Sequence, residues 1–157
     1  MPVEKMTDSM RGILRSFFER EWGSSKMVSR GVIHQLDQLP GFIYLEDDNI
    51  IGIITYHVSE NQCEIVSLDS FSENRGIGSS LLNQVVDEAK RNGWTLWLIT
   101  TNDNTRALHF YQRRGFLLTN VYWNGVDEAR KIKPEIPMVS DDGIPIKHEM
   151  ELVYQSK

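Results

Sequence analysis

Two glycines, Gly76 and Gly78, separate a segment with the pattern of a β-strand from a segment with the pattern of an amphipathic helix. The preceding strand pattern covers residues 62–69, and the following segment repeats apolar residues at helical spacing as far as Ala89. Glycine has no Cβ, so the backbone can turn tightly here and come close to another group. This strand–turn–helix unit restricts the chain to folds in which helices pack on a sheet.

The start of this helix has the features of an anion-binding site. The first N–H groups of a helix have no partner within it, and the helix dipole favours a negative charge at that end. Ser79 and Ser80 add hydroxyl donors. A dinucleotide fingerprint would need a third glycine where the chain has Leu81, and the Gly-Lys-Ser/Thr of a P-loop does not occur. The glycine turn is therefore either purely structural or a cradle for a phosphate group of another kind.

The hydrophobic patterns predict one α/β (α+β) domain over residues 1–157, with one mixed sheet and helices on its faces. Turn residues at 47–49 and 59–61 divide three neighbouring strands, which we expect to form an antiparallel meander. The other predicted elements are a helix at 8–22 capped by Asp8 or Ser9, a short strand at 27–29, a helix from 76 to 92, a strand at 94–100, a helix at 104–114, a strand at 116–123, a helical turn at 127–131 and a strand at 148–154.

Composition excludes several classes of protein. The formal net charge is −5 without a basic run, so the chain lacks the Lys/Arg clusters of a nucleic-acid binder, whereas an acidic surface attracts cationic amines. No segment approaches the roughly 20 apolar residues that cross a membrane. The N-terminus does not resemble a signal peptide, and the one cysteine, Cys63, is either a buried structural thiol or a nucleophile. We therefore expect a cytoplasmic protein that binds neither nucleic acid nor membrane.

The predicted helix at 104–114 carries an Asn and a Tyr on one face. Asn104 and Tyr111 are seven residues apart, almost two turns, which places them roughly 10 Å apart along the axis. Ala107 between them leaves room for a slender chain to lie against that face. Asn104 either caps the helix or binds a ligand, and Tyr111 is either a core aromatic or a functional phenol.

Together these segments resemble the GNAT N-acetyltransferase superfamily, whose members bind acetyl-CoA. The resemblance covers about residues 42–123 and rests on Gly76-Ile77-Gly78 at the start of a helix and on Asn104-x-x-Ala107…Tyr111…Gly115-Phe116 one strand later. It implies the GNAT-like acyl-CoA N-acyltransferase fold, with a mostly antiparallel sheet, and acetyl-CoA as the cosubstrate. The chain departs from the family at Glu73, where Arg or Gln is usual, and Arg75 is placed to compensate.

The resemblance also implies roles for particular residues. The backbone amides of the glycine loop would hold the pyrophosphate, and the strand before it would pair with the pantetheine arm and polarise the thioester. Tyr111 would protonate the departing thiolate. The predicted cofactor-binding residues are Leu68, Asp69, Ser70, Asn74, Arg75, Gly76, Ile77, Gly78, Ser79, Asn104 and Ala107.

The implied reaction is transfer of an acetyl group from acetyl-CoA to a primary amine. An alkylammonium must lose a proton before it attacks, because its reference pKa is near 10.4. Glu64 occupies the place where some family members carry a catalytic Glu, although it is equally explained as a solvent-facing strand residue. The acceptor site is expected from helix 8–22 and the loop after it (Trp22, His34) and from strand 116–123 and the connection after it (Tyr122, Trp123, Met138).

Other interpretations remain open from the sequence. The aromatic residues near 122 could belong to the core or to a homodimer surface instead of an acceptor site. The chain could also be a non-catalytic acyl-CoA-binding sensor, or an acetyltransferase for protein lysines or N-termini. The leading prediction is an N-acetyltransferase that acts on a small-molecule amine.

Overall fold

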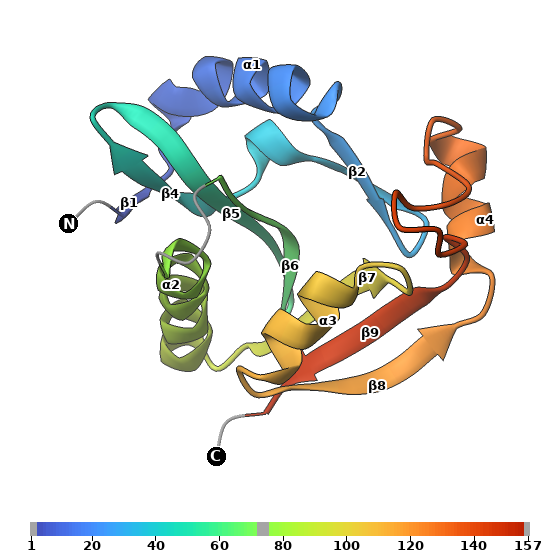
Figure 1. Cartoon of the computed structure of the whole chain (residues 1–157). Helices are drawn as coiled ribbons and strands as arrows, with labels where there is room; N and C mark the ends of the chain where they lie inside the picture. Colours follow the sequence, from blue (N-terminus) through green and yellow to red (C-terminus); the bar gives the residue numbers. More distant parts are fainter. Residues whose placement is uncertain (1–2, 72–75, 156–157) are drawn as a thin grey trace. The chain divides into compact units, whose positions relative to one another are not determined.

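The computed structural model describes residues 3–71 and 76–155 (Figure 1). The chain divides into two compact units. The first unit comprises Met1–Met27 and His34–Leu96, and the second comprises Val28–Ile33 and Trp97–Lys157. The hairpin of β2 (Lys26–Ser29) and β3 (Val32–Gln35) and the strand β7 (Thr95–Thr101) contribute residues to both units. The prediction of one domain over residues 1–157 stays a prediction.

The first unit contains the predicted antiparallel meander. Strands β4 (Gly41–Glu46), β5 (Asn49–Ser59) and β6 (Gln62–Ser70) pair in that order, and β1 (Val3–Lys5) pairs with the other edge of β4. Asp47 and Asp48 form the two-residue turn between β4 and β5, with φ of 52° and 65°. Two consecutive positive φ values match the twist of a hairpin, and Asp tolerates them better than most residues.

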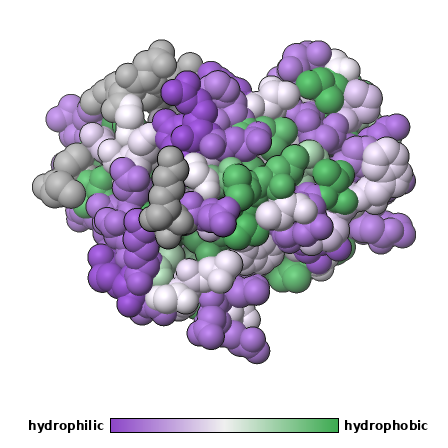
Figure 2. Space-filling model, turned by 90° about the horizontal axis from the view of Figure 1, so that it is seen from below, coloured by the Kyte–Doolittle hydropathy of each residue, from purple (hydrophilic) through white to green (hydrophobic). Residues whose placement is uncertain are grey.

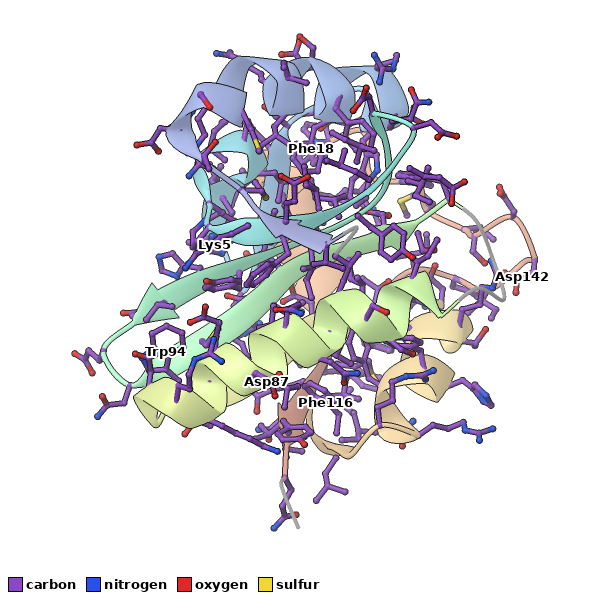
Figure 3. All side chains as sticks on the ribbon, turned by 90° about the vertical axis from the view of Figure 1, so that its left-hand side faces the viewer. Lys5, Phe18, Asp87, Trp94, Phe116 and Asp142 are labelled. Carbon is purple, nitrogen blue, oxygen red and sulfur yellow. The ribbon has the colours of Figure 1, made fainter. Side chains whose placement is uncertain are left out.

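Helix α1 (Arg11–Trp22) buries one stripe of apolar side chains in the first unit. Leu14, Phe17 and Phe18 lie at helical spacing and pack with Leu36, Ile53 and other members of one core cluster. Figure 3 shows Phe18 on the side of α1 that faces the strands. Gly23 ends α1 with φ of 76°, as its position after the apolar pattern predicts. Asp8 and Ser9 do not cap α1, because they form a 3₁₀ turn, η1 (Asp8–Met10), before it.

Helix α2 (Ile77–Asn92) packs closely on β5 through a glycine. Its buried residues repeat at helical spacing from Ile77 to Ala89. A Cβ on Gly52 of β5 would lie only 2.6 Å from Ile77 Cγ2 and 3.0 Å from Leu81 Cδ1. Gly52 therefore lets the first turn of α2 approach the sheet closely.

The second unit has its own antiparallel strands, in the order β7-β9-β8. They are β7, β8 (Phe116–Tyr122) and β9 (Glu149–Tyr154), and the helices are α3 (Thr105–Gln112) and α4 (Gly125–Ile132). Strand β8 exposes Leu117, Leu118 and Val121 to about half of their surface. Figure 2 shows hydrophobic surface on the face of the molecule that it draws.

The structure confirms the predicted fold class, an α/β (α+β) protein with mostly antiparallel strands flanked by helices. The differences from the prediction are short elements. Strands β1 and β3 were not predicted, because three or four residues are too few to show alternation. Helix α4 is a full two turns where a single turn at 127–131 was expected.

Candidate functional site

The predicted phosphate cradle lies at the start of α2. Gly76 has φ of 70° and precedes the first helical residue, Ile77, and it has no side chain to cap the helix. Among backbone contacts, the Ser80 N–H donates to the Gly76 carbonyl at 3.0 Å, which closes the first turn. A Cβ at Gly76 would meet no atom within 4 Å, so glycine is required here by φ and not by space.

The amides of Ile77, Gly78 and Ser79 occupy the first turn of α2, the position that favours an anion. The predicted residues Asn74 and Arg75, and Glu73 beside them, lie outside the described residues.

The predicted thioester-facing residues lie at the end of β6 that precedes this turn. Leu68, Asp69 and Ser70 pair with Ile54, Ile53 and Gly52 of β5. Asp69 faces the same side of the sheet as Ile53, a member of the core cluster under α1. Its Oδ2 atom is buried and has no hydrogen-bond partner among the described residues. Burial raises the pKa of Asp69 to about 7 because the ionised form loses hydration.

Glu64 lies nearer the start of β6 and is buried, with 6% of its surface exposed. Its Oε1 atom is 3.5 Å from Nε2 of His34 on β3, which is also buried. Directly across the ladder, Glu64 pairs with His57 of β5, whose ring centroid is 5.2 Å from that of His34. Glu64 is therefore not a solvent-facing strand residue, and it belongs to a small cluster of titratable side chains.

A β-bulge in β6 determines which way Glu64 points. Thr55 pairs with Ser67 and Tyr56 pairs with Ile65, so Val66 is the extra residue on β6. The bulge breaks the alternation of side chains along the strand, and all residues from Cys63 to Ser67 are buried. Cys63 is the buried structural thiol of the two alternatives, and burial, with Glu64 and Glu88 adding repulsion, raises its pKa to about 12.

The second unit holds the predicted residues of α3. Asn104 caps this helix, because its Oδ1 atom accepts a hydrogen bond from the Ala107 N–H at 3.2 Å. Tyr111 is buried, and its ring contacts those of Phe110 and Phe116, each with centroids 5.2 Å apart. The structural alternative is thus observed for each residue, because Asn104 is a cap and Tyr111 packs against aromatic neighbours, while their roles toward a ligand stay predictions.

Side chains also anchor the long connection between α4 and β9. The guanidinium group of Arg130 donates to the carbonyls of Ile136, Pro137 and Ile146. Asn102, just after β7, donates to the Pro145 carbonyl and accepts from the N–H groups at 147 and 148. Sequence patterns did not single out either residue, because each acts through carbonyl and amide groups far along the chain.

An ion pair between exposed Arg30 and buried Glu149 joins the β2–β3 turn to β9 within the second unit. Arg30 donates to Glu149 through its backbone N–H and through Nη1, at 3.2 and 3.0 Å. Its guanidinium carbon also lies 3.6 Å from the centre of the Tyr122 ring. Tyr122, predicted to line the acceptor site, therefore packs against a cation of its own chain, and its hydroxyl group donates to Glu151 at 2.8 Å.

The other predicted acceptor residues have different surroundings. Trp22 packs edge-on against Phe18, and His34 joins the Glu64 cluster. Trp123 stacks on His148, with centroids 4.1 Å apart, while most of its surface stays exposed. Met138 is largely exposed. Of the predicted acceptor residues in the first unit, only His34 lies beside a candidate catalytic group.

A shallow cleft of about 790 Å³ occurs elsewhere in the first unit. It is lined by α1, the β4–β5 turn and Phe71. Phe71 is seven residues from Glu64, which corresponds to roughly 20 Å along an extended strand. This cleft is therefore distinct from the Glu64 cluster. In the described ranges, no group of three or more His, Cys, Asp or Glu side chains could hold a metal ion, and no helix is long and apolar enough to cross a membrane.

The fold and these residues define a class of protein. The model of the Acetyltransferase (GNAT) family matches residues 7–116, which is more than half of the chain. The chain therefore belongs to the GNAT acetyltransferase family, as its glycine turn and α3 residues predicted.

Similar proteins support this assignment. The chain is 48% identical over 147 residues to the uncharacterized protein YxbD of Bacillus subtilis, covering 92% of each chain, and 46% identical over 140 residues to YdhI of the same organism, covering 88% of each. A solved GNAT family acetyltransferase from Elizabethkingia anophelis, with acetyl-CoA bound, has the same fold, with a TM-score of 0.66 over 98% of this chain and 97% of that one. Their sequences are 19% identical, so this likeness concerns the fold.

Proposed function

We propose that this protein is an acetyl-CoA-dependent N-acetyltransferase that acetylates a primary amine of a small molecule. Acetyl-CoA is the cosubstrate of the family to which the chain belongs, and it is bound in the solved neighbour described above. In this proposal the first-turn amides of α2 bind the pyrophosphate, and Leu68–Ser70 contact the pantetheine arm and the thioester. Asn104 and Ala107 present the face of α3 along which the same arm runs.

The reaction needs one base and one acid. Glu64 accepts a proton from the ammonium group, and the freed nitrogen lone pair attacks the thioester carbonyl carbon. A strand N–H near Leu68 stabilises the oxyanion, a type of interaction whose removal costs about 3 kcal/mol. The C–S bond then breaks, the electron pair leaves with sulfur, and Tyr111 donates its phenolic proton to the thiolate. The nitrogen of the new amide loses its second proton, which restores the Tyr111 phenol.

The burial of Glu64 carries this proposal. A carboxylate on a solvent-facing strand would need no explanation, but Glu64 is 6% exposed and lies beside a buried imidazole. Buried carboxylates are costly and concentrate at functional sites. The acidic balance of the chain, −5, favours a cationic acceptor over an anionic one. We also propose that the enzyme acts in the cytoplasm, as a monomer or a homodimer.

Turnover of an amine panel tests the proposal. Release of free CoA is followed with a thiol reagent, for which the buried Cys63 gives little background. Glu64→Gln and Tyr111→Phe should each lower kcat by roughly 10²-fold or more, with little change in the Kd of acetyl-CoA. His109→Ala, an exposed change on the same helix as Tyr111, is the control.

The outcome separates the alternative functions. Binding of acetyl-CoA without turnover of any amine or peptide would favour a sensor and contradict the proposal. Turnover of lysine peptides alone would show a protein acetyltransferase. Full activity in Glu64→Gln would remove Glu64 from the mechanism while leaving the acetyltransferase assignment in place.

A further inference from the structure

The imidazole of His34 is buried in an unusual state. Its Nε2 atom is inaccessible to solvent and has no hydrogen-bond partner among the described residues. The Glu64 carboxylate is 3.5 Å away, close enough for an ion pair but longer than a good hydrogen bond. Leaving a buried polar atom unsatisfied costs about 1–3 kcal/mol. The pair is therefore poised to gain free energy when a proton arrives between the two groups.

Hydrogen bonds hold the segment that follows His34. The Leu36 N–H donates to the Ser25 carbonyl at 2.7 Å, and the Gln35 side chain bonds both Ser25 and Asp37. Arg11 of α1 donates to the carbonyls of Asp37 and Leu39, which fixes the short helix η2 (Leu36–Gln38). These bonds fix the end of β3 that carries His34 beside Glu64.

The other titratable groups near His34 lie on three elements. Glu64 comes from β6 and His57 from β5, while Asp37 on η2 is occupied by bonds from Gln35 and Gln38. His57 is exposed, pairs with Glu64 across the ladder, and has its ring centroid 5.2 Å from that of His34. Glu64 and His34 are buried to the same degree, with 6% and 5% of their surface exposed, so His57 is the exposed member of the three.

We propose that His34 is a positioning residue that receives the acceptor's proton from Glu64 and passes it outward past His57. This inference rests on the proposed function. The ammonium N–H bond breaks and its electron pair stays on nitrogen, while the proton moves through the Glu64 carboxyl group to Nε2 of His34. The result is an imidazolium beside a carboxylate, joined by a charge-assisted hydrogen bond across the former 3.5 Å gap. The imidazolium then loses a proton to solvent, directly or through His57, and the pair returns to its starting state.

This arrangement also explains how one buried carboxylate can act repeatedly. A Glu64 side chain that kept the proton would have to lose it to water before the next turnover, yet it is 6% exposed. The His34 ring lies beside that of the exposed His57, and an imidazole can take up and release a proton, so the two rings connect the buried carboxylate to solvent. Removal of His34 should therefore slow turnover more than it weakens the binding of either substrate.

Three variants and one small molecule test the proposal. His34→Gln keeps a polar side chain of similar size but cannot carry a proton in this way, and His34→Ala leaves a cavity that imidazole can enter. We expect each to lower kcat by roughly 10–100-fold with the KM for acetyl-CoA unchanged within about threefold. Added imidazole should restore much of the kcat of His34→Ala but none of that of Glu64→Gln.

Two further variants test whether His34 carries a proton or only packs against Glu64. If His34 and Glu64 act as one unit, the double variant His34→Gln/Glu64→Gln should be no slower than Glu64→Gln alone. His57→Phe, which keeps a ring, should cause a smaller loss that higher buffer concentration reverses. His109→Ala is the matched control, and thermal unfolding checks that each variant is folded.

The outcomes distinguish failure of the proposed function from failure of the proton relay alone. A wild-type protein that turns over no amine contradicts the proposed function and the relay with it. An active wild type whose His34→Gln variant keeps its kcat contradicts the relay alone. Additive losses in the double variant, or no rescue of His34→Ala by imidazole, would show that His34 only packs against Glu64.

Discussion

Replacement of Asp69 by Asn should make the protein more stable at neutral pH and not at acidic pH. The Oδ2 atom of Asp69 is buried without a partner among the described residues, and burial raises its pKa from 3.8 to about 7. This shift of about three units corresponds to a ceiling of about 4 kcal/mol between the ionised and neutral forms. Because part of the Asp69 surface stays exposed to solvent, water can relax around the ionised carboxylate. We therefore expect the actual free-energy difference to be about half of this ceiling.

The sign follows from which state binds the proton. Below pH 4 the carboxyl group is protonated in both the folded and the unfolded chain, so it has no pH-dependent effect. Between about pH 4 and pH 7 the unfolded chain ionises while the folded protein still holds the proton, so stability falls as pH rises. Above pH 7 both states are ionised and the loss is complete. An Asn side chain does not ionise in this range, so the Asp69→Asn variant does not lose stability as the pH rises.

Urea unfolding of the two proteins, followed by tryptophan fluorescence, measures the effect. The difference in free energy of unfolding should grow by about 1–2 kcal/mol between pH 5 and pH 8 in favour of Asp69→Asn. Asp87→Asn is the matched control, since Asp87 is exposed on α2 (Figure 3). A difference that stays constant with pH would refute the argument that burial suppresses ionisation of Asp69.

Three other perturbations test parts of the structure that sequence patterns alone do not reach. Gly76→Ala should destabilise the fold by about 1 kcal/mol because of its positive φ, and should also weaken CoA binding, while Gly12→Ala in the open first turn of α1 should stabilise it slightly; urea unfolding and calorimetry measure both. Arg130→Ala should cost about 2–3 kcal/mol and speed amide exchange in the segment after α4, because carbonyls lose a charged donor. Cys63 should react with a thiol reagent only at the rate of unfolding, and fast labelling of the native protein at pH 8 would contradict its burial.

The elements that sequence reasoning predicted well are those with several repeats of one period. The apolar stripes of α1 and α2 cover three or more turns each, and Gly23 and Gly93 end them with positive φ. The meander of β4, β5 and β6 was predictable because polar turns divide three runs rich in strand formers. Strand β3, which supplies His34, was not predicted because its four residues show no alternation of apolar and polar side chains.

The candidate site was predictable only where it depends on local geometry. The glycine at the start of α2 needs a positive φ, and Asn104 and Tyr111 share a helix face by spacing alone. The contact between His34 and Glu64 joins residues thirty positions apart, and no local pattern implies it. Such a contact follows from strand register, which depends on every turn between the two residues.

The bulge at Val66 shows why register could not be derived from the sequence. Without it, strict alternation would place Glu64 and Val66 on one face and Ser67 on the other. The extra residue resets that alternation, so Val66 joins the core under α1 while Ser67 bonds Thr55 at 2.6 Å. A single inserted residue thus turns an ambiguous strand carboxylate into a buried neighbour of His34. If this reasoning holds, deletion of Val66 should move Glu64 away from His34, so that little turnover remains even if the chain still folds.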